Sequence, residues 1–141
     1  MTFRQITTLS ALLLAACLAS AQEPAIKKVP MKQTSPASGK EMYTQYCAAC
    51  HGADAKGDGP AATALKTPPT DLTQLAKNNN GKYPANHVYS SIVGDLNVPA
   101  HGTAEMPMWG NVYRSMSRGH EAELQQRVSN LTHYIESLQV K

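Results

Sequence analysis

Apolar residues near the end of the chain recur at the spacing of one helix face. Relative to the first of them, they stand at i, i+4, i+7, i+11 and i+14, and mostly polar residues lie between them. The five residues are Leu124, Val128, Leu131, Ile135 and Leu138. Side chains at these intervals form one stripe along a 3.6-residue helix. We therefore predict a long amphipathic helix over residues 121–139.

A second helical pattern leads up to a pair of cysteines. Ser38 and Glu41 have the spacing of a capping box, and Tyr43 and Tyr46 follow at helical intervals just before Cys47. We predict a helix that begins after Ser38 and runs into the cysteine pair.

Two shorter helices are predicted in the middle of the chain. Residues 71–77 follow Thr70, which is a suitable N-cap, and residues 84–93 begin with Pro84 in their first turn. The stretch 52–69 is rich in Gly and Pro, which predicts a loop. No βαβ setting, which a thioredoxin-like redox motif would need, is visible among these elements.

The N-terminal segment has the pattern of an export signal. Residues 1–21 hold one early cation, Arg4, then an apolar run over 6–18 that is too short to span a bilayer, and an A-x-A site that ends at Ala21. Cleavage after Ala21 predicts a soluble periplasmic protein. The alternative is lipidation of Cys17, which follows a lipoprotein-like box and would attach the protein to a membrane.

The rest of the chain divides into a linker and one domain. Residues 22–37 contain several lysines and prolines but few large apolar groups, which predicts a flexible linker. Residues 38–141 contain no internal repeat and predict a single domain. This domain has no Phe, so a bulky apolar cofactor would supply mass that the core lacks. The formal net charge of +3 gives no support to nucleic-acid binding.

The cysteine pair belongs to the motif Cys47-Ala48-Ala49-Cys50-His51. C-x-x-C-H is the attachment signature of a c-type haem, in which both thiols form thioethers to the porphyrin and the histidine binds the iron. A redox disulfide and half of a zinc site are the alternatives. A zinc site needs four ligands, and the only other cysteine is Cys17 in the leader. We therefore favour covalent haem.

Residues 38–141 resemble the class I, monohaem c-type cytochromes. Gly39, Tyr43 and the Cys47–His51 motif stand at the relative spacings of that family's first helix, and Leu131 and Tyr134 match paired positions of its last helix. The resemblance implies a small all-α fold around one covalently bound haem c. The lack of a Cβ at Gly39 would let the two helices approach closely, with Tyr43 beside Tyr134.

The same resemblance gives roles to two residues outside the motif. The Pro60 carbonyl is the expected acceptor for the Nδ1 hydrogen of His51, which would fix the orientation of the imidazole. An ordinary turn proline is the alternative. Trp109 is expected to pack on the haem edge or to donate its N–H to a propionate, with plain core packing as the alternative.

The sixth iron ligand is expected from a Met-Pro pair. Met106, followed by Pro107, looks like the axial-methionine segment of class I cytochromes, and the proline favours an extended backbone at Met106. Met108 lies two residues on and is a rival, because alternate residues of an extended segment face the same way. His101 and His87 offer a bis-histidine alternative.

These features predict a protein that transfers electrons and is not an enzyme. With His51 and Met106 both bound to iron, the haem would exchange single electrons with transient redox partner proteins. One alternative is the haem subunit of a larger oxidase or dehydrogenase complex. Another is a ligand-binding or peroxidase-like haem protein whose sixth ligand is labile.

Overall fold

The computed structural model of the protein describes residues 31–94 and 108–140. The described residues from Lys32 onward belong to one compact unit, and their regular structure is helical. This agrees with the predicted all-α fold. None of the helices in these two ranges is both long enough and apolar enough to cross a bilayer. The expected signal peptide, Cys17 and Met106 lie outside the described residues.

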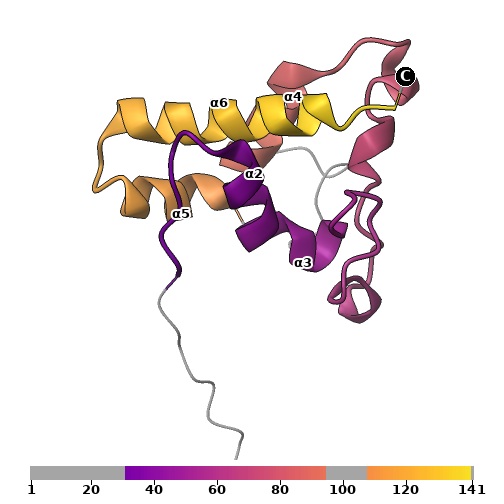
Figure 1. Cartoon of the computed structure of the whole chain (residues 1–141), viewed down its shortest axis with the longest axis horizontal. Coiled ribbons are helices and arrows are strands. Elements are labelled where there is room, and N and C mark those ends of the chain that lie inside the picture. Colours follow the sequence, from indigo (N-terminus) through magenta and orange to yellow (C-terminus); the bar gives the residue numbers. More distant parts are fainter. Residues whose placement is uncertain (1–30, 95–107, 141) are drawn as a thin grey trace, which may run out of the picture. The chain divides into compact units, whose positions relative to one another are not determined.

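The helix predicted before the cysteine pair forms and continues through the motif (Figure 1). It consists of α2 (Gly39–Met42), the π-helical turn η1 (Tyr43–Cys47) and α3 (Ala48–His51). Ser38 caps it, since its Oγ accepts a hydrogen bond from the backbone N–H of Glu41 at 3.1 Å. In a capping box the Glu side chain accepts the backbone N–H of the N-cap residue, which here is Ser38. The Glu41 carboxylate instead accepts the N–H of Ser35 at 3.1 Å.

The helix predicted over residues 71–77 is replaced by two short 3-10 turns, η3 (Leu72–Gln74) and η4 (Lys77–Asn79). The predicted cap is also wrong, because the side chain of Asp71 accepts the N–H of Thr73 at 2.9 Å. A further 3-10 turn, η2 (Ala62–Ala64), interrupts the predicted loop.

Three longer helices complete the fold. They are α4 (Ala85–Val93), α5 (Trp109–Met116) and α6 (Glu121–Ser137). The sequence predicted α4 and α6 nearly to their ends. It did not predict α5, although Trp109, Val112, Tyr113 and Met116 stand at i, i+3, i+4 and i+7. In Figure 1, α6 lies above α5 and is crossed by α2.

The terminal helix α6 is the centre of the packing, since α2, α4 and α5 all contact it. Its buried face contains Leu124, Val128, Leu131 and Ile135, as the spacing predicted. The crossing with α2 depends on Gly39, where a Cβ would lie only 2.2 Å from the carbonyl oxygen of Asn130. The predicted close approach of these two helices is therefore present.

Residues 32–37 are bound to the domain, which corrects the C-terminal end of the predicted linker. We call these residues the N-terminal strap. Thr34 is buried, and its carbonyl accepts a hydrogen bond from Nη1 of Arg127 at 2.8 Å. The Tyr46 hydroxyl donates to the Lys32 carbonyl and contacts Oγ1 of Thr34 at 3.1 Å. The composition of this segment predicted a flexible linker. Contacts through backbone carbonyls leave no pattern in a sequence, so composition could not reveal them.

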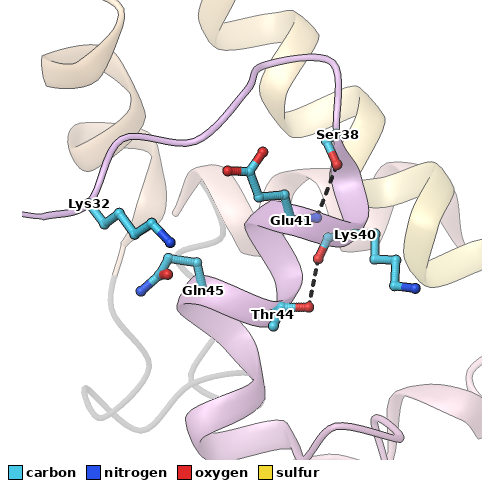
Figure 2. Close-up of a pocket in the computed structure, with 6 residues that line it drawn as sticks. All are labelled: Lys32, Ser38, Lys40, Glu41, Thr44 and Gln45. Atoms are coloured by element: carbon cyan, nitrogen blue, oxygen red, sulfur yellow. Dashed lines mark hydrogen bonds between the residues drawn. The ribbon is translucent and has the colours of Figure 1, made fainter.

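A shallow pocket of about 330 Å³ lies between the strap and the first helix (Figure 2). Its lining is polar and consists of Lys32, Ser38, Lys40, Glu41, Thr44 and Gln45. No residue of the Cys47–His51 motif lines it. This pocket is therefore separate from the expected haem attachment site.

The Arg127→Ala variant is expected to lose about 2–3 kcal/mol of unfolding free energy, because buried charged hydrogen bonds would be lost. Arg127 is only 3% exposed and also binds the Glu123 carboxylate at 2.8 Å. Without the guanidinium, the Thr34 carbonyl would have no donor from α6. Denaturant unfolding of the haem-bearing protein, followed by circular dichroism, measures this loss of stability. Trypsin should also cleave after Lys32 more rapidly in the variant, because the strap would no longer be held by Arg127.

Arg114→Ala is the matched control for this prediction. Arg114 pairs with Glu121 at 3.8 Å, and both side chains are at least half exposed. Exposed ion pairs contribute about 0–1 kcal/mol. Equal losses in the two arginine variants would show that the strap contact does not stabilise the domain.

Candidate haem attachment site

The Cys47–His51 motif ends the first helix, and the following loop binds the exposed end of that helix. The last four carbonyls of a helix have no partner within the helix itself. Here each accepts a backbone N–H from the loop. The pairs are Gly52 to Ala48 (3.0 Å), Ala61 to Ala49 (2.9 Å), Gly59 to Cys50 (3.0 Å) and Gly57 to His51 (2.8 Å). The glycine-rich loop therefore holds the motif in place through four main-chain bonds.

The imidazole of His51 is oriented for binding a metal through Nε2. Its Nδ1 lies 3.0 Å from the carbonyl oxygen of Thr70. A carbonyl only accepts hydrogen bonds, so Nδ1 carries the hydrogen and Nε2 keeps a free lone pair. Burial lowers the pKa of His51, although the bond to Thr70 opposes this shift. The ring is therefore neutral at pH 7, which is the form that binds metal ions.

The acceptor at Thr70 corrects the expected role of Pro60. Pro60 is exposed and lies nine positions after His51, whereas Thr70 lies 19 positions after it. The same chemistry is achieved, because a main-chain carbonyl fixes the tautomer in either case. No side-chain pattern could have identified Thr70, since its contribution comes from the backbone alone.

The thiol of Cys47 does not have the properties of a redox-active cysteine. Burial, followed by the charge of Cys50, raises the pKa of Cys47 to about 12. Reactive C-x-x-C cysteines instead have lowered thiol pKa values, which favour the nucleophilic thiolate. The two cysteines are free in the structure. The environment of Cys47 therefore argues against the redox-disulfide alternative.

The zinc alternative also finds no ligand set among the described residues. Within residues 31–94 and 108–140, no three His, Cys, Asp or Glu side chains lie close enough together to hold a metal ion. Among these described residues, His51 is therefore not part of a group of three or more such ligands. An iron held mainly by a porphyrin needs no such cluster.

Tyr43 connects the motif to the terminal helix. Its ring packs on that of Tyr134 with centroids 5.4 Å apart, so the predicted contact between them is present. Its hydroxyl is buried and donates a hydrogen bond to the carbonyl of Gly52 at 2.7 Å. Burial raises the pKa of Tyr43 above its usual value, so the hydroxyl keeps its hydrogen. Tyr43 thus fixes the residue that directly follows His51.

The Tyr43→Phe variant is expected to lose about 0.5–1.5 kcal/mol of stability, because the buried Gly52 carbonyl would lose its 2.7 Å hydrogen bond and keep only the 3.2 Å bond from the Ala55 N–H. We also expect a shift of the haem Soret band, since Gly52 follows the iron-binding His51. Denaturant unfolding and visible absorption of the purified protein measure the two effects.

Tyr83→Phe provides the control for Tyr43→Phe. The Tyr83 hydroxyl donates to the Thr132 carbonyl at 2.9 Å, and neither residue belongs to the haem motif. This variant should lose stability and keep the wild-type Soret band. An identical spectral shift in both variants would contradict the role given to Tyr43.

Trp109 and Met108, which the sequence analysis considered as haem contacts, differ in exposure. Trp109 is buried and stacks on Tyr46, with ring centroids 5.3 Å apart. Its contact with a haem edge or propionate stays a prediction. Met108 is 59% exposed and directly precedes α5. Met106, the expected sixth ligand, and His101 lie outside the described residues, so ligation by Met106 also stays a prediction.

Residues 34–92 match the family described as cytochrome c oxidase, cbb3-type, subunit III. The matched stretch is a c-type cytochrome domain and contains the whole Cys47–His51 motif. Neither the curated proteins nor the solved structures gave a significant match. Over residues 34–92 the chain is therefore similar to a c-type cytochrome domain. This match and the helical fold of the described residues are consistent with the predicted small all-α fold of a class I, monohaem c-type cytochrome.

The residues of the site fit the cofactor that this class carries, one covalently bound haem c. Cys47 and Cys50 supply two free thiols, and His51 supplies a neutral imidazole with Nε2 available. The haem provides a one-electron couple when it is bound, so the domain functions in haem-based electron transfer. The chain holds the imidazole through Thr70 and the end of its helix through the loop.

Proposed function

We propose that this protein is an exported single-electron carrier whose iron is bound by His51 and Met106. The observation that carries the proposal is the orientation of His51, which leaves Nε2 free beside two free thiols. The Met106-Pro107 pair, which directly precedes Met108 and α5, supports the choice of sixth ligand. With both axial positions filled by protein, no position on the iron is open to a substrate, so the protein is not an enzyme.

The proposed contact with redox partners is formed by Met108 and the loop from Ala53 to Ala62. Met108 is one of the few exposed large apolar residues among those described, and much of the loop is exposed. Redox encounters use small interfaces, often below about 1,200 Å². Chemical crosslinking to an electron donor or acceptor should therefore map to this surface. Crosslinks confined to the exposed face of α6 would contradict it.

We further propose that residues 1–21 are removed after export to the periplasm. Cleavage after Ala21 gives a soluble protein, whereas lipidation at Cys17 gives one attached to a membrane. The mass of the mature N-terminal peptide distinguishes the two forms. A mature protein that begins at Met1 would contradict both.

A redox-titrated visible spectrum of the exported protein tests the proposed function. We expect covalent haem that remains after denaturation, low-spin iron, an absorption band from the methionine-iron bond, and a potential well above that of bis-histidine haems. Carbon monoxide should change the spectrum little at neutral pH. A strong response to carbon monoxide together with high-spin iron would instead support the ligand-binding alternative.

A second candidate is a haem subunit of a larger oxidase complex. The description of the matched family, subunit III of a cbb3-type oxidase, favours it. The electron-transfer chemistry would be the same, but the partner would be permanent. Purification from native membranes under mild conditions separates the two functions, because a subunit should remain with its complex and a carrier should not.

A further inference from the structure

The segment that carries the Thr70 carbonyl is held by the residues that follow α6. Thr70 itself is exposed and belongs to no helical turn, so its position depends on its neighbours. Residues 72–76, just after it, are hydrogen-bonded to Gln139 and Val140 (Figure 1). The acceptor for the His51 imidazole therefore belongs to a segment that is fixed from a distant part of the chain.

The side-chain amide of Gln139 uses both of its hydrogens and its oxygen in this contact. Its Nε2 donates to the Leu72 carbonyl at 2.7 Å and to the Ile135 carbonyl at 2.9 Å. Its Oε1 accepts the N–H of Ala76 at 2.8 Å. Only a primary amide presents two N–H donors and a carbonyl acceptor without a charge. Gln139 thus ties the segment after Thr70 to the last turn of α6.

Two main-chain hydrogen bonds hold the same segment from opposite sides. The N–H of Val140 donates to the Thr73 carbonyl at 3.0 Å, and the N–H of Leu72 donates to the Ala55 carbonyl at 2.8 Å. Thr73 is only 6% exposed. Ala55 belongs to the loop that binds the end of the haem motif. The segment is therefore fixed between this loop and the residues after α6.

We infer that Gln139 is a positioning residue for the axial imidazole, and that it acts through the segment from Thr70 to Ala76. This inference rests on the proposed binding of iron by His51, but not on the identity of the sixth ligand. Leu72 lies two residues after Thr70, so a displacement of Leu72 also moves the Thr70 carbonyl. The hydrogen bond from Nδ1 of His51 to this carbonyl, 3.0 Å long, weakens when its distance or angle changes.

Loss of the Gln139 amide should raise the reduction potential of the haem. A hydrogen bond donated by Nδ1 makes the imidazole a more basic ligand, which favours the ferric iron. Gln139→Met keeps the approximate length of the side chain and removes all three hydrogen bonds. We expect the ratio of ferrous to ferric protein at a fixed potential to increase about threefold. This corresponds to about 28 mV, since a tenfold change is about 59 mV for one electron.

NMR of the ferrous protein measures the hydrogen bond itself. In Gln139→Met the Nδ1 proton of His51 should shift upfield and exchange with water more rapidly, because its bond to the Thr70 carbonyl is weaker. A residue that only stabilised the fold would lower the unfolding free energy and leave both the potential and this resonance unchanged.

A second variant reaches the same segment through a different bond. Val140→Pro removes the N–H that donates to the Thr73 carbonyl, because proline has no backbone N–H. The potential and the Nδ1 proton should change in the same directions as in Gln139→Met, by less.

Asn130→Leu is the matched control. Asn130 also lies on α6, and its side-chain amide also donates to a main-chain carbonyl, that of Pro36 at 2.9 Å. Pro36 belongs to the N-terminal strap and not to the segment that carries Thr70. This variant should lose stability and keep the wild-type potential and Nδ1 resonance.

The pattern across the three variants decides the inference. A raised potential and an upfield Nδ1 proton in Gln139→Met and Val140→Pro, with wild-type values in Asn130→Leu, support it. Wild-type values in both Gln139→Met and Val140→Pro overturn it. An equal change in Asn130→Leu also overturns it, because general loosening of the fold would then be the cause.

The proposed function fails in a different way. The ring protons of an axial histidine are shifted strongly upfield by the haem ring. If those of His51 in the wild-type ferrous protein lack this shift, His51 does not bind the iron. That result concerns the ligation and not the role of Gln139.

Discussion

Met106→Ala is expected to lower the reduction potential of the haem by about 0.1 V or more, within the roughly 0.8 V range that axial ligands set. Removing the thioether takes away a ligand that favours the reduced iron. The iron should become high-spin or bind an exchangeable ligand, and carbon monoxide should bind readily. Potentiometric titration with visible spectroscopy measures these changes on the same sample.

Met108→Ala is the control for this prediction. Met108 is 59% exposed and close to Gly94, and its removal should leave the ligation and the spin state unchanged. A loss of the methionine-iron band in Met108→Ala, with the band retained in Met106→Ala, would reverse the assignment. Equal effects of the two substitutions would contradict a single methionine ligand.

The Gly59→Ala variant is expected to lose most of its covalent haem during maturation. A Cβ at this position would lie 2.4 Å from the Ala49 oxygen, 2.6 Å from the Cys50 carbonyl carbon and 2.7 Å from the Ala48 oxygen. All three atoms belong to the backbone of the attachment motif, so no side chain can move aside. We expect a destabilisation of about 3 kcal/mol, at the upper end of ordinary overpacking. In-gel haem staining of the exported protein measures the loss.

Gly81→Ala separates this effect from the general cost of replacing a glycine. Gly81 lies in an exposed turn with a φ of +79°, and no atom lies within 4 Å of its Cβ. Alanine there should cost about 1–2 kcal/mol through its backbone conformation alone and leave haem attachment intact. Normal haem staining in Gly59→Ala would show that the loop does not hold the motif as the hydrogen bonds indicate.

Local patterns predicted the elements whose physical causes are local. The spacing of Leu124 and Val128 along one face was sufficient for α6, because that face is buried against three other helices. The five residues of the haem motif were also sufficient for the class of cofactor, since the chemistry needs two thiols and an imidazole at a fixed separation. The contact between Tyr43 and Tyr134 followed from the family resemblance.

Contacts between distant parts of the chain were not predictable in the same way. The N-terminal strap is held by Arg127, which lies 93 positions after Thr34. Composition alone predicted a flexible linker there. Two 3-10 turns after Asp71 replaced the expected helix. In the same region, the Thr70 carbonyl accepts the hydrogen bond from His51 that was expected to go to Pro60.

The sequence by itself determined that this protein is helical and that it attaches a haem, because amphipathic spacing and the C-x-x-C-H motif act over a few neighbouring residues. The tertiary structure decided how the motif is held. It supplied the Thr70 carbonyl for the imidazole and the loop N–H groups for the helix end. These interactions depend on backbone atoms that every residue carries, and backbone atoms become partners only when the chain has folded.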